Sequence, residues 1–386
     1  MEIRRLAGEA CKTTRQLWEE VFVEDSPKFV DYYYEKKASH NIAYVSGEEP
    51  YEAMLFRTPY TVQILDRVRE LSYIVGVATR EEFRHKGKMT ALLMKAMEEM
   101  YSQRQPFTFL MPANPEIYRP FGFHYVYERP QWSFKDEDFA LKVLEPIIGT
   151  PKSITLPKEE PGQRQELQAA EMESARTEKR QKAAGEKAQT EIQLFSLSGL
   201  LQELRADDRR EAEGKIMNRL ADFANQWLAR HYQIYVKRDV RYFERQLEEN
   251  QAENGDIFLL TSGEKLEGFF LYAREGGEIF IQEMMESQPG GFSFLHQGEE
   301  KKPIIMARII HLEEMMKLIK SPHNRTVLID IEDPLLPQND GLYLWELTPF
   351  GSRVTRQREG QKAEVFMTVD ELLPHLLQGV FLNEVV

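Results

Sequence analysis

The stretch from Arg84 to Lys88 (RHKGK) carries four cationic or near-cationic side chains around one glycine. Anion binding is the chemistry that these residue types favour. The first N–H groups of a helix are unpaired and the helix dipole is positive there, so a helix N-terminus attracts phosphates. Glycine lets a phosphate approach the backbone, and arginine adds a planar fork of donors. The stretch predicts a diphosphate-binding turn; a solvated basic turn with a glycine at the helix start is the alternative.

This turn lies between a predicted strand and a predicted helix. Leu71 to Thr79 (LSYIVGVAT) is apolar and β-branched, which is typical of a buried strand. From Met89 to Met100 the apolar residues recur at helical spacing, and Phe107 to Pro112 (FTFLMP) reads as the next buried strand. A strand–helix–strand order with this crossover length favours parallel pairing of the two strands.

A second phrase, Tyr118-Arg-Pro-Phe-Gly122-Phe123, follows about thirty residues later. The two phrases together resemble the GNAT acetyltransferase superfamily. Its acetyl-CoA motif, Arg/Gln-x-x-Gly-x-Gly/Ala after a strand, is matched from Arg84 to Met89, with methionine where the family usually has a small residue. Its later Tyr-x-x-x-Gly-Phe phrase is matched from Tyr118 to Phe123.

Within that superfamily, the chain as a whole resembles the enhanced intracellular survival (Eis) family, and the phrase from Arg238 to Glu244 (RDVRYFE) adds to the likeness. The resemblance implies an α/β fold with mixed sheets, in which tandem GNAT-like domains precede a sterol-carrier-protein-like domain. We expect a catalytic GNAT domain over 1–150, then a charged linker and a degenerate GNAT-like domain over 151–290. A sterol-carrier-protein-like domain over 291–386 would bring its C-terminus to the active site. The family also implies a homo-oligomer, a hexamer.

The resemblance assigns roles to individual residues. Val77 and Thr79 would offer backbone groups to the pantetheine arm. Tyr118 would protonate the departing CoA thiolate as general acid. The terminal carboxylate of Val386 would be the general base, with a C-terminal tail that only packs against the domain as the alternative. The residues expected around the pyrophosphate are Arg84, His85, Lys86, Gly87 and Lys88.

Two acidic residues follow the helix predicted over Thr13 to Phe22, at the place where the family builds its amine pocket. Glu24 and Asp25 are candidate contacts for a cationic substrate, with solvated carboxylates as the alternative. Trp18 and Phe22 are candidates for the wall of the same pocket, with core packing as the alternative.

Composition excludes several classes of function. A net charge of −13 argues against a general nucleic-acid surface. The single cysteine, Cys11, gives neither a disulfide framework nor a cysteine-based zinc site, and the histidines show no paired metal spacing. We therefore expect no metal, no nucleic acid and no membrane. The N-terminal residues lack the apolar core of a signal peptide, so the cytoplasm is the expected location.

The rest of the chain reads as two further units. Residues 158–193 are charged and polar, typical of an exposed helix or a linker. An amphipathic helix around Ile216 to Leu228 and a strand meander from Ile257 to Gln282 follow. A third unit begins near Ala307, with a helix at Asp370 to Leu377 capped by Thr368 and an apolar end to the chain.

These patterns and the resemblance predict an acetyl-CoA-dependent N-acetyltransferase. The acceptor would be a primary amine on a small cationic molecule, such as an aminoglycoside or a polyamine. The amine would attack directly, because no activated cysteine or serine–histidine pair is visible. Two alternatives remain: a protein lysine N-acetyltransferase, and a non-catalytic sensor that binds CoA in the first domain and an apolar ligand in the third.

Overall fold

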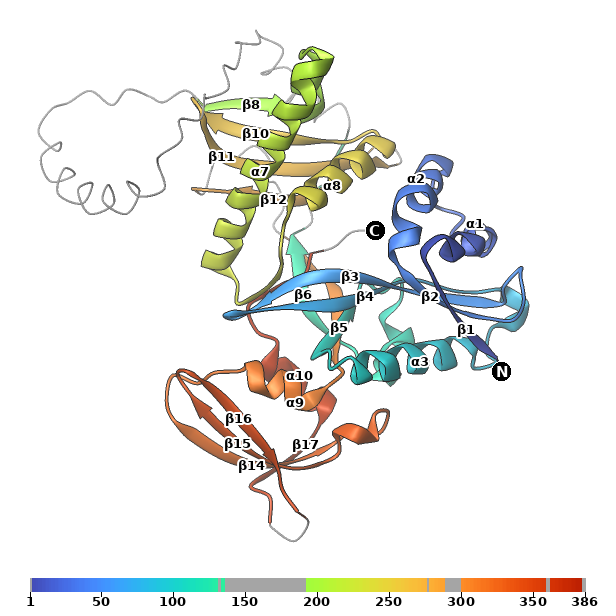
Figure 1. The fold of residues 1–386 in the computed structure, drawn as a ribbon, viewed down its shortest axis with the longest axis vertical. Coiled ribbons are helices and arrows are strands. Elements are labelled where there is room, and N and C mark those ends of the chain that lie inside the picture. The colour runs from blue at the N-terminus through green and yellow to red at the C-terminus, as the bar shows by residue number, and fades with distance from the viewer. Residues whose placement is uncertain are drawn as a thin grey trace, which may run out of the picture.

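The computed structural model describes residues 2–130, 133–135, 192–275, 278–288, 300–358 and 362–383. These residues form three sheets, which follow one another along the long axis of the molecule (Figure 1). The largest sheet lies in the middle, between a five-stranded and a four-stranded sheet. Side chains of all three units, among them Tyr73, Leu220 and Trp345, belong to one buried cluster.

The turn predicted at Arg84 to Lys88 follows a strand of the central, nine-stranded sheet. Its main path runs, in spatial order, through β1 (Ile3–Ala7), β2 (Ile42–Ser46), β3 (Ala53–Ile64), β4 (Arg67–Thr79), β5 (Phe107–Leu110), β13 (Lys301–Ile309) and β6 (His124–Pro130). Off this path, β9 (Ile234–Val236) pairs with β3 and β18 (Val380–Phe381) pairs with β9. The helix α3 (Lys88–Ser102) connects β4 to β5, and these strands are parallel, which confirms the predicted crossover.

Strand β13 corrects the expected domain boundary. We placed residues from 291 onward, and the run near Ala307, in the third unit. Instead β13 lies between β5 and β6, with Arg308 opposite Thr108 and Ala307 opposite His124. The middle unit is thus inserted between two neighbouring strands of the central sheet. An apolar run shows that a strand is buried, but local sequence does not say in which sheet.

Helices near the N-terminus cover one face of the central sheet (Figure 1). They are α1 (Arg15–Val21) and α2 (Pro27–Tyr32), flanked by the short helical segments Gly8–Thr14, Tyr33–Lys37 and Ala38–His40. Ser26 caps α2 by accepting a hydrogen bond from the Phe29 N–H at 3.2 Å. The aromatic side chains of this region form a compact core with Trp18 at its centre.

The middle unit has an antiparallel sheet with helices packed on it. In spatial order the strands are β7 (Ser133–Lys135), β12 (Glu278–Glu286), β11 (Lys265–Glu275), β10 (Asp256–Ser262) and β8 (Ile192–Ser196). Its helices are α6 (Leu197–Gln202), α7 (Ala206–His231) and α8 (Val240–Ala252). The predicted amphipathic helix and meander are confirmed. The charged segment 158–193 lies outside the described residues except for its last two.

The third unit is a four-stranded sheet with helices that join it to the central sheet. Its strands, in spatial order, are β16 (Gly351–Arg356), β15 (Gly341–Thr348), β14 (Arg325–Glu332) and β17 (Val365–Thr368). The helices are α9 (Leu312–Leu318) and α10 (Val369–Leu376). Thr368 and Glu371 form a capping box at the start of α10, which confirms the predicted cap. No described helix is both long enough and apolar enough to span a bilayer.

Candidate active site

The site begins where the parallel strands β4 and β5 separate. They pair only at Tyr73 with Phe109 and at Ile74 with Leu110. Beyond these pairs β4 continues to Thr79 alongside β3, while its other edge has no partner strand in the described chain. The last residues of β4, with Val77 and Thr79 among them, therefore line an opening between two strands of the sheet.

A bulge in β4 marks the start of this opening. The register between β3 and β4 shifts at Gly76, whose φ is +59°. A Cβ at Gly76 would lie 2.6 Å from Cζ3 of Trp18, so both the backbone and the packing require glycine. A bulge bends a strand and increases its twist, which turns the end of β4 away from β5. Gly76 was not among the residues predicted from the sequence, although a lone glycine inside a strand pattern is a signal for a bulge.

The turn after β4 has the backbone that anion binding needs. Gly87 has a φ of +72° and caps α3, and a Cβ there would meet no atom within 4 Å. The first hydrogen bond of α3 runs from the Ala91 N–H to the Gly87 carbonyl at 3.0 Å. The N–H groups of residues 88–90 thus have no partner within the helix, and open space lies beside Gly87.

The basic side chains around Gly87 are not equivalent. Arg84, His85 and Lys86 are exposed, and none pairs with a carboxylate of the described residues. Arg84 Nε donates to the Thr79 carbonyl at 3.2 Å, which holds its guanidinium against the end of β4. Lys88 is already engaged, because its ammonium donates to the Glu52 carboxylate. The structure therefore brings all five predicted residues to one turn, and the charges of Arg84 and Lys86 have no carboxylate partner among the described residues.

Tyr118 is held in a short turn between β5 and β6. Its side chain is 8% exposed, and its ring contacts the ring of Phe123 edge-on at 6.0 Å between centroids. Within the described chain its hydroxyl has no hydrogen-bond partner. Burial raises the pKa of Tyr118 to about 12, because the low-polarity surroundings disfavour the phenolate. The phenol is therefore protonated at neutral pH and has its O–H available as a donor.

The predicted substrate-pocket residues separate into two groups. Trp18 is buried, confirming core packing, and its indole Nε1 also donates to Asp25 Oδ2 at 2.7 Å. Because the Trp18 ring packs over Gly76, Asp25 is linked to the bulge that opens the site. Phe22 packs against Trp18 at 4.8 Å. Glu24 is exposed and contacts no described polar group, so the structure does not bring it to this cluster.

The C-terminal segment is anchored between the units as far as Asn383. Asn383 is buried; its amide donates to the Gln282 carbonyl at 2.9 Å, and its carbonyl accepts a hydrogen bond from Arg238 Nη2, also at 2.9 Å. Arg238 is itself fixed by a buried ion pair with Glu283 at 2.6 Å. Val386, the predicted general base, lies outside the described residues.

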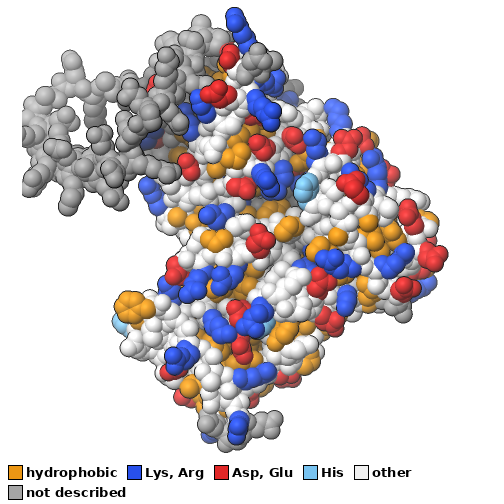
Figure 2. All heavy atoms as spheres, viewed as in Figure 1, with side chains coloured by type: hydrophobic (Ala, Val, Ile, Leu, Met, Phe, Trp, Pro, Cys, Tyr) orange, Lys and Arg blue, Asp and Glu red, His pale blue; other side chains and the backbone are white. Residues whose placement is uncertain are grey.

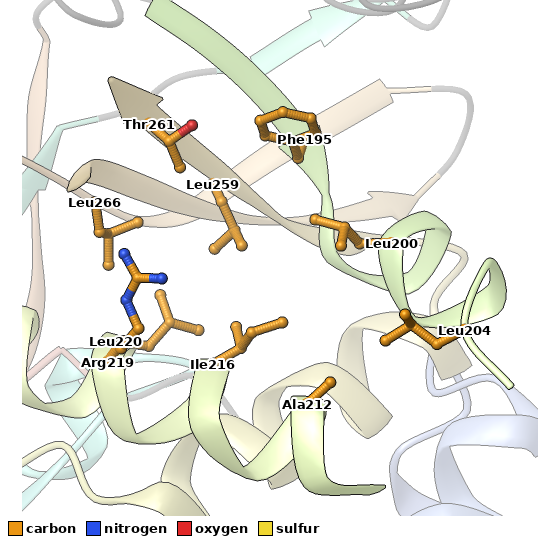
Figure 3. Close-up of a pocket in the computed structure, with 10 residues that line it drawn as sticks. All are labelled: Phe195, Leu200, Leu204, Ala212, Ile216, Arg219, Leu220, Leu259, Thr261 and Leu266. Carbon is orange, nitrogen blue, oxygen red and sulfur yellow. The ribbon is translucent and has the colours of Figure 1, made fainter. Parts of the chain in front are cut away.

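An apolar pocket lies in the middle unit, away from these elements. It has a volume of about 70 Å³ and is bounded by helices α6 and α7 and by strands β8, β10 and β11 (Figure 3). Leu200, Ile216 and Leu259 point into it, and the Arg219 guanidinium lies at one side (Figure 3). None of its lining residues belongs to the strand opening, the turn or the Tyr118 loop.

Charge on the surface is mixed. Basic and acidic side chains alternate over the face shown in Figure 2, without a broad area of one sign. Among the described residues, no group of three or more His, Cys, Asp or Glu side chains is placed to hold a metal ion.

Comparisons with known proteins agree with this geometry. Residues 2–126 match the family model for the acetyltransferase (GNAT) domain. No curated protein sequence matches the chain. The match over residues 2–126 makes this part of the chain similar to GNAT acetyltransferase domains, and the chain is an N-acetyltransferase.

Solved structures share the fold of nearly the whole chain at low identity. A conserved protein of unknown function from Enterococcus faecalis, described as a probable N-acyltransferase, has a TM-score of 0.66 at 16% identity, over 97% of this chain and 89% of that one. A GCN5-related N-acetyltransferase from Kribbella flavida has a TM-score of 0.63 at 12% identity, over 100% of both chains. Eis1 from Mycobacterium abscessus has a TM-score of 0.61 at 11% identity, over 98% of this chain and 90% of that one.

Proposed function

We propose that the enzyme transfers the acetyl group of acetyl-CoA to a primary amine on a small cationic molecule, such as an aminoglycoside or a polyamine. One feature supports the proposal: the end of β4 that has no partner on the β5 side in the described chain runs from Gly76, against which the Trp18 ring packs, to the turn at Gly87. A ligand with an anionic head and an extended arm fits such an arrangement. Acetyl-CoA has that chemistry, and GNAT domains use it.

In this proposal the turn holds the diphosphate and the strand holds the arm. The free N–H groups of residues 88–90 donate to the diphosphate, while Arg84 and Lys86 supply charge. The unpaired edge of β4 at Val77 and Thr79 offers peptide groups to the amides of the pantetheine arm. The acetyl group would then lie where β4 and β5 separate.

Transfer proceeds by direct attack. The amine nitrogen adds to the thioester carbonyl carbon, a C–N bond forms, and the C–S bond breaks. Tyr118 gives its phenolic proton to the departing sulfur, and the proton that the new amide nitrogen loses restores the phenol. General acid catalysis of this kind is typically worth ~10²–10⁴ in rate. Most of the remaining acceleration comes from holding amine and thioester together.

The proposal that the acceptor is a cation is supported by a carboxylate bonded to the side chain that packs on Gly76. Asp25 is fixed by Trp18 rather than free to rotate, so it offers a defined partner for an ammonium group. The chain as a whole is acidic, with a net charge of −13, and this charge attracts a cationic substrate.

Release of free CoA tests the reaction and its acceptor. The purified protein mixed with acetyl-CoA and either a polyamine or an aminoglycoside should release CoA in proportion to amine consumed. Release with lysine-containing proteins but with none of a broad panel of small amines would establish the protein lysine acetyltransferase alternative instead. CoA binding without release on any amine would support the sensor.

The base is proposed from the family resemblance. The Val386 carboxylate would take the proton that the ammonium loses, and the anchoring of the chain up to Asn383 is compatible with that role. Adding several residues after Val386 moves the carboxylate, so kcat should fall while acetyl-CoA affinity holds. Full activity of the extended chain would rule this base out.

A further inference from the structure

Arg308 is a buried cation that touches the loop of Tyr118. It lies on β13, and its side chain is among the largest that are fully buried. Its Nε donates to the Phe121 carbonyl at 2.7 Å, its Nη1 to the Ile309 carbonyl at 2.6 Å, and its Nη2 to Asp333 Oδ1 at 2.6 Å. A buried charge persists only when it is paired and hydrogen-bonded, so these contacts fix the guanidinium.

On one side, Arg308 supports the turn that carries Tyr118. The Phe121 N–H donates to the Tyr118 carbonyl at 3.0 Å, and the Phe123 N–H donates to the same oxygen at 3.4 Å. Gly122 continues the turn with a φ of +72°, and a Cβ there would lie 3.4 Å from Arg308 Nε. The guanidinium thus packs directly beneath the backbone that aims the phenol.

On the other side, Arg308 is held by the third unit. Asp333 follows β14, and its carboxylate also accepts hydrogen bonds from the Leu336 N–H at 3.1 Å and from the Asn339 amide at 2.9 Å. These bonds leave the carboxylate only one orientation. Leu336 belongs to the same buried cluster as Tyr118, so the turn after β14 and the Tyr118 loop also share apolar packing.

We propose that Arg308 is a positioning residue for Tyr118, and that the third unit takes part in acetyl transfer by holding Arg308 through Asp333. This inference rests on the proposed role of Tyr118 as proton donor. The phenol has to reach the sulfur within hydrogen-bond distance, and a misplacement of about 1 Å is enough to cost on the order of 10²-fold in rate. Arg308 acts on catalysis only through the position of that hydroxyl.

A double-mutant comparison separates this role from general stability. Arg308→Lys keeps the charge but loses the fork that joins Phe121 to Asp333. It should lower kcat roughly 10–100-fold, with KM for acetyl-CoA within about twofold. In the Tyr118→Phe background the same substitution should cost less than about threefold, because the proton donor is already gone.

Arg57→Lys is the matched control. Arg57 is also a buried arginine of the central sheet, but it is bonded to Ser72, Tyr44 and Gln103 rather than to the Tyr118 loop. Arg57→Lys should lower kcat by the same factor in the native protein and in Tyr118→Phe. Asp333→Asn removes the charge that holds Arg308 together with one of two acceptor oxygens, and it carries the same comparison if Arg308→Lys does not fold.

The outcomes are distinct. An equal loss from Arg308→Lys with and without the Tyr118 hydroxyl would overturn the positioning role while leaving the proposed function intact. Full kcat in the single variant Tyr118→Phe would instead refute the proton donor itself. A large loss in the native background that almost disappears in Tyr118→Phe supports both.

Discussion

Replacement of Gly76 by alanine tests whether the bulge in β4 opens the site. The new Cβ would lie 2.6 Å from Trp18 and 2.9 Å from Cδ2 of Phe56, in a backbone with φ of +59°. The left-handed backbone costs a non-glycine residue about 1–2 kcal/mol. Overpacking of a buried ring costs about 1–3 kcal/mol more. The free energy of unfolding should therefore fall by roughly 2–5 kcal/mol.

Gly8→Ala is the control that isolates packing from backbone strain. Gly8 has a φ of +62° in the same unit, and a Cβ there would meet no atom within 4 Å. The free energy of unfolding of Gly8→Ala should fall only by the cost of the left-handed backbone, about 1–2 kcal/mol. Urea unfolding followed by tryptophan fluorescence measures both variants, and at about 2–4 °C per kcal/mol the difference is also visible as a shift in Tm.

The same pair of variants should differ in function. The methyl group that Gly76→Ala adds displaces Trp18 and with it Asp25, so this variant should raise KM for the amine, whereas Gly8→Ala should not. Equal losses of stability in the two variants would refute the close packing of Trp18 on the bulge. Native KM values in Gly76→Ala would refute the link between the bulge and the acceptor side of the site.

Three further predictions concern single side chains. The pKa of Tyr118 is about 12 in the folded protein and 10.0 ordinarily, so between these pH values the folded state binds more protons than the unfolded state. The free energy of unfolding should therefore fall as the pH rises from 10 to 12. This contribution, up to about 3 kcal/mol, should be missing in Tyr118→Phe when the two proteins are unfolded in urea at pH 8 and pH 11.5. Asp25→Asn should raise KM for a cationic amine about tenfold at unchanged acetyl-CoA affinity, and Glu24→Gln should not. Equal KM values for the two variants in steady-state kinetics would refute the proposal that Asp25 binds the ammonium group. Ala212→Leu should fill part of the middle-unit pocket and raise Tm by a few degrees without changing kcat; a lower Tm would show that the pocket has no room for the added side chain.

Local patterns predicted the parts of the site that are contiguous in sequence. The parallel pair β4–β5 and the glycine turn before α3 depend on a few neighbouring residues, and both were predicted, whereas Tyr118 was singled out only by the family resemblance. Gly87 was singled out because it lets a phosphate approach the backbone, and the structure adds a second reason for glycine, its left-handed φ of +72°.

The parts that sequence reasoning missed depend on distant contacts. The place of β13 in the central sheet is decided by pairing with strands about two hundred residues away. The burial of Arg308 follows from that place, because its partners Phe121 and Asp333 come from different units. Trp18 was given two alternative readings, core or pocket wall, and it is both buried and bonded to Asp25, which periodicity alone does not show.

Calorimetric titration of acetyl-CoA into the native protein, Gly87→Ala and Gly8→Ala tests the central claim most directly. The added methyl group at Gly87 meets open space in the free protein but would stand where the diphosphate approaches the N–H groups of α3. Hydrogen bonds to charged groups are worth about 1.5–3 kcal/mol, so Gly87→Ala should bind acetyl-CoA roughly 10–100-fold more weakly, while Gly8→Ala binds it as the native protein does. Equal affinity in all three proteins would contradict an acetyl-CoA site at this turn.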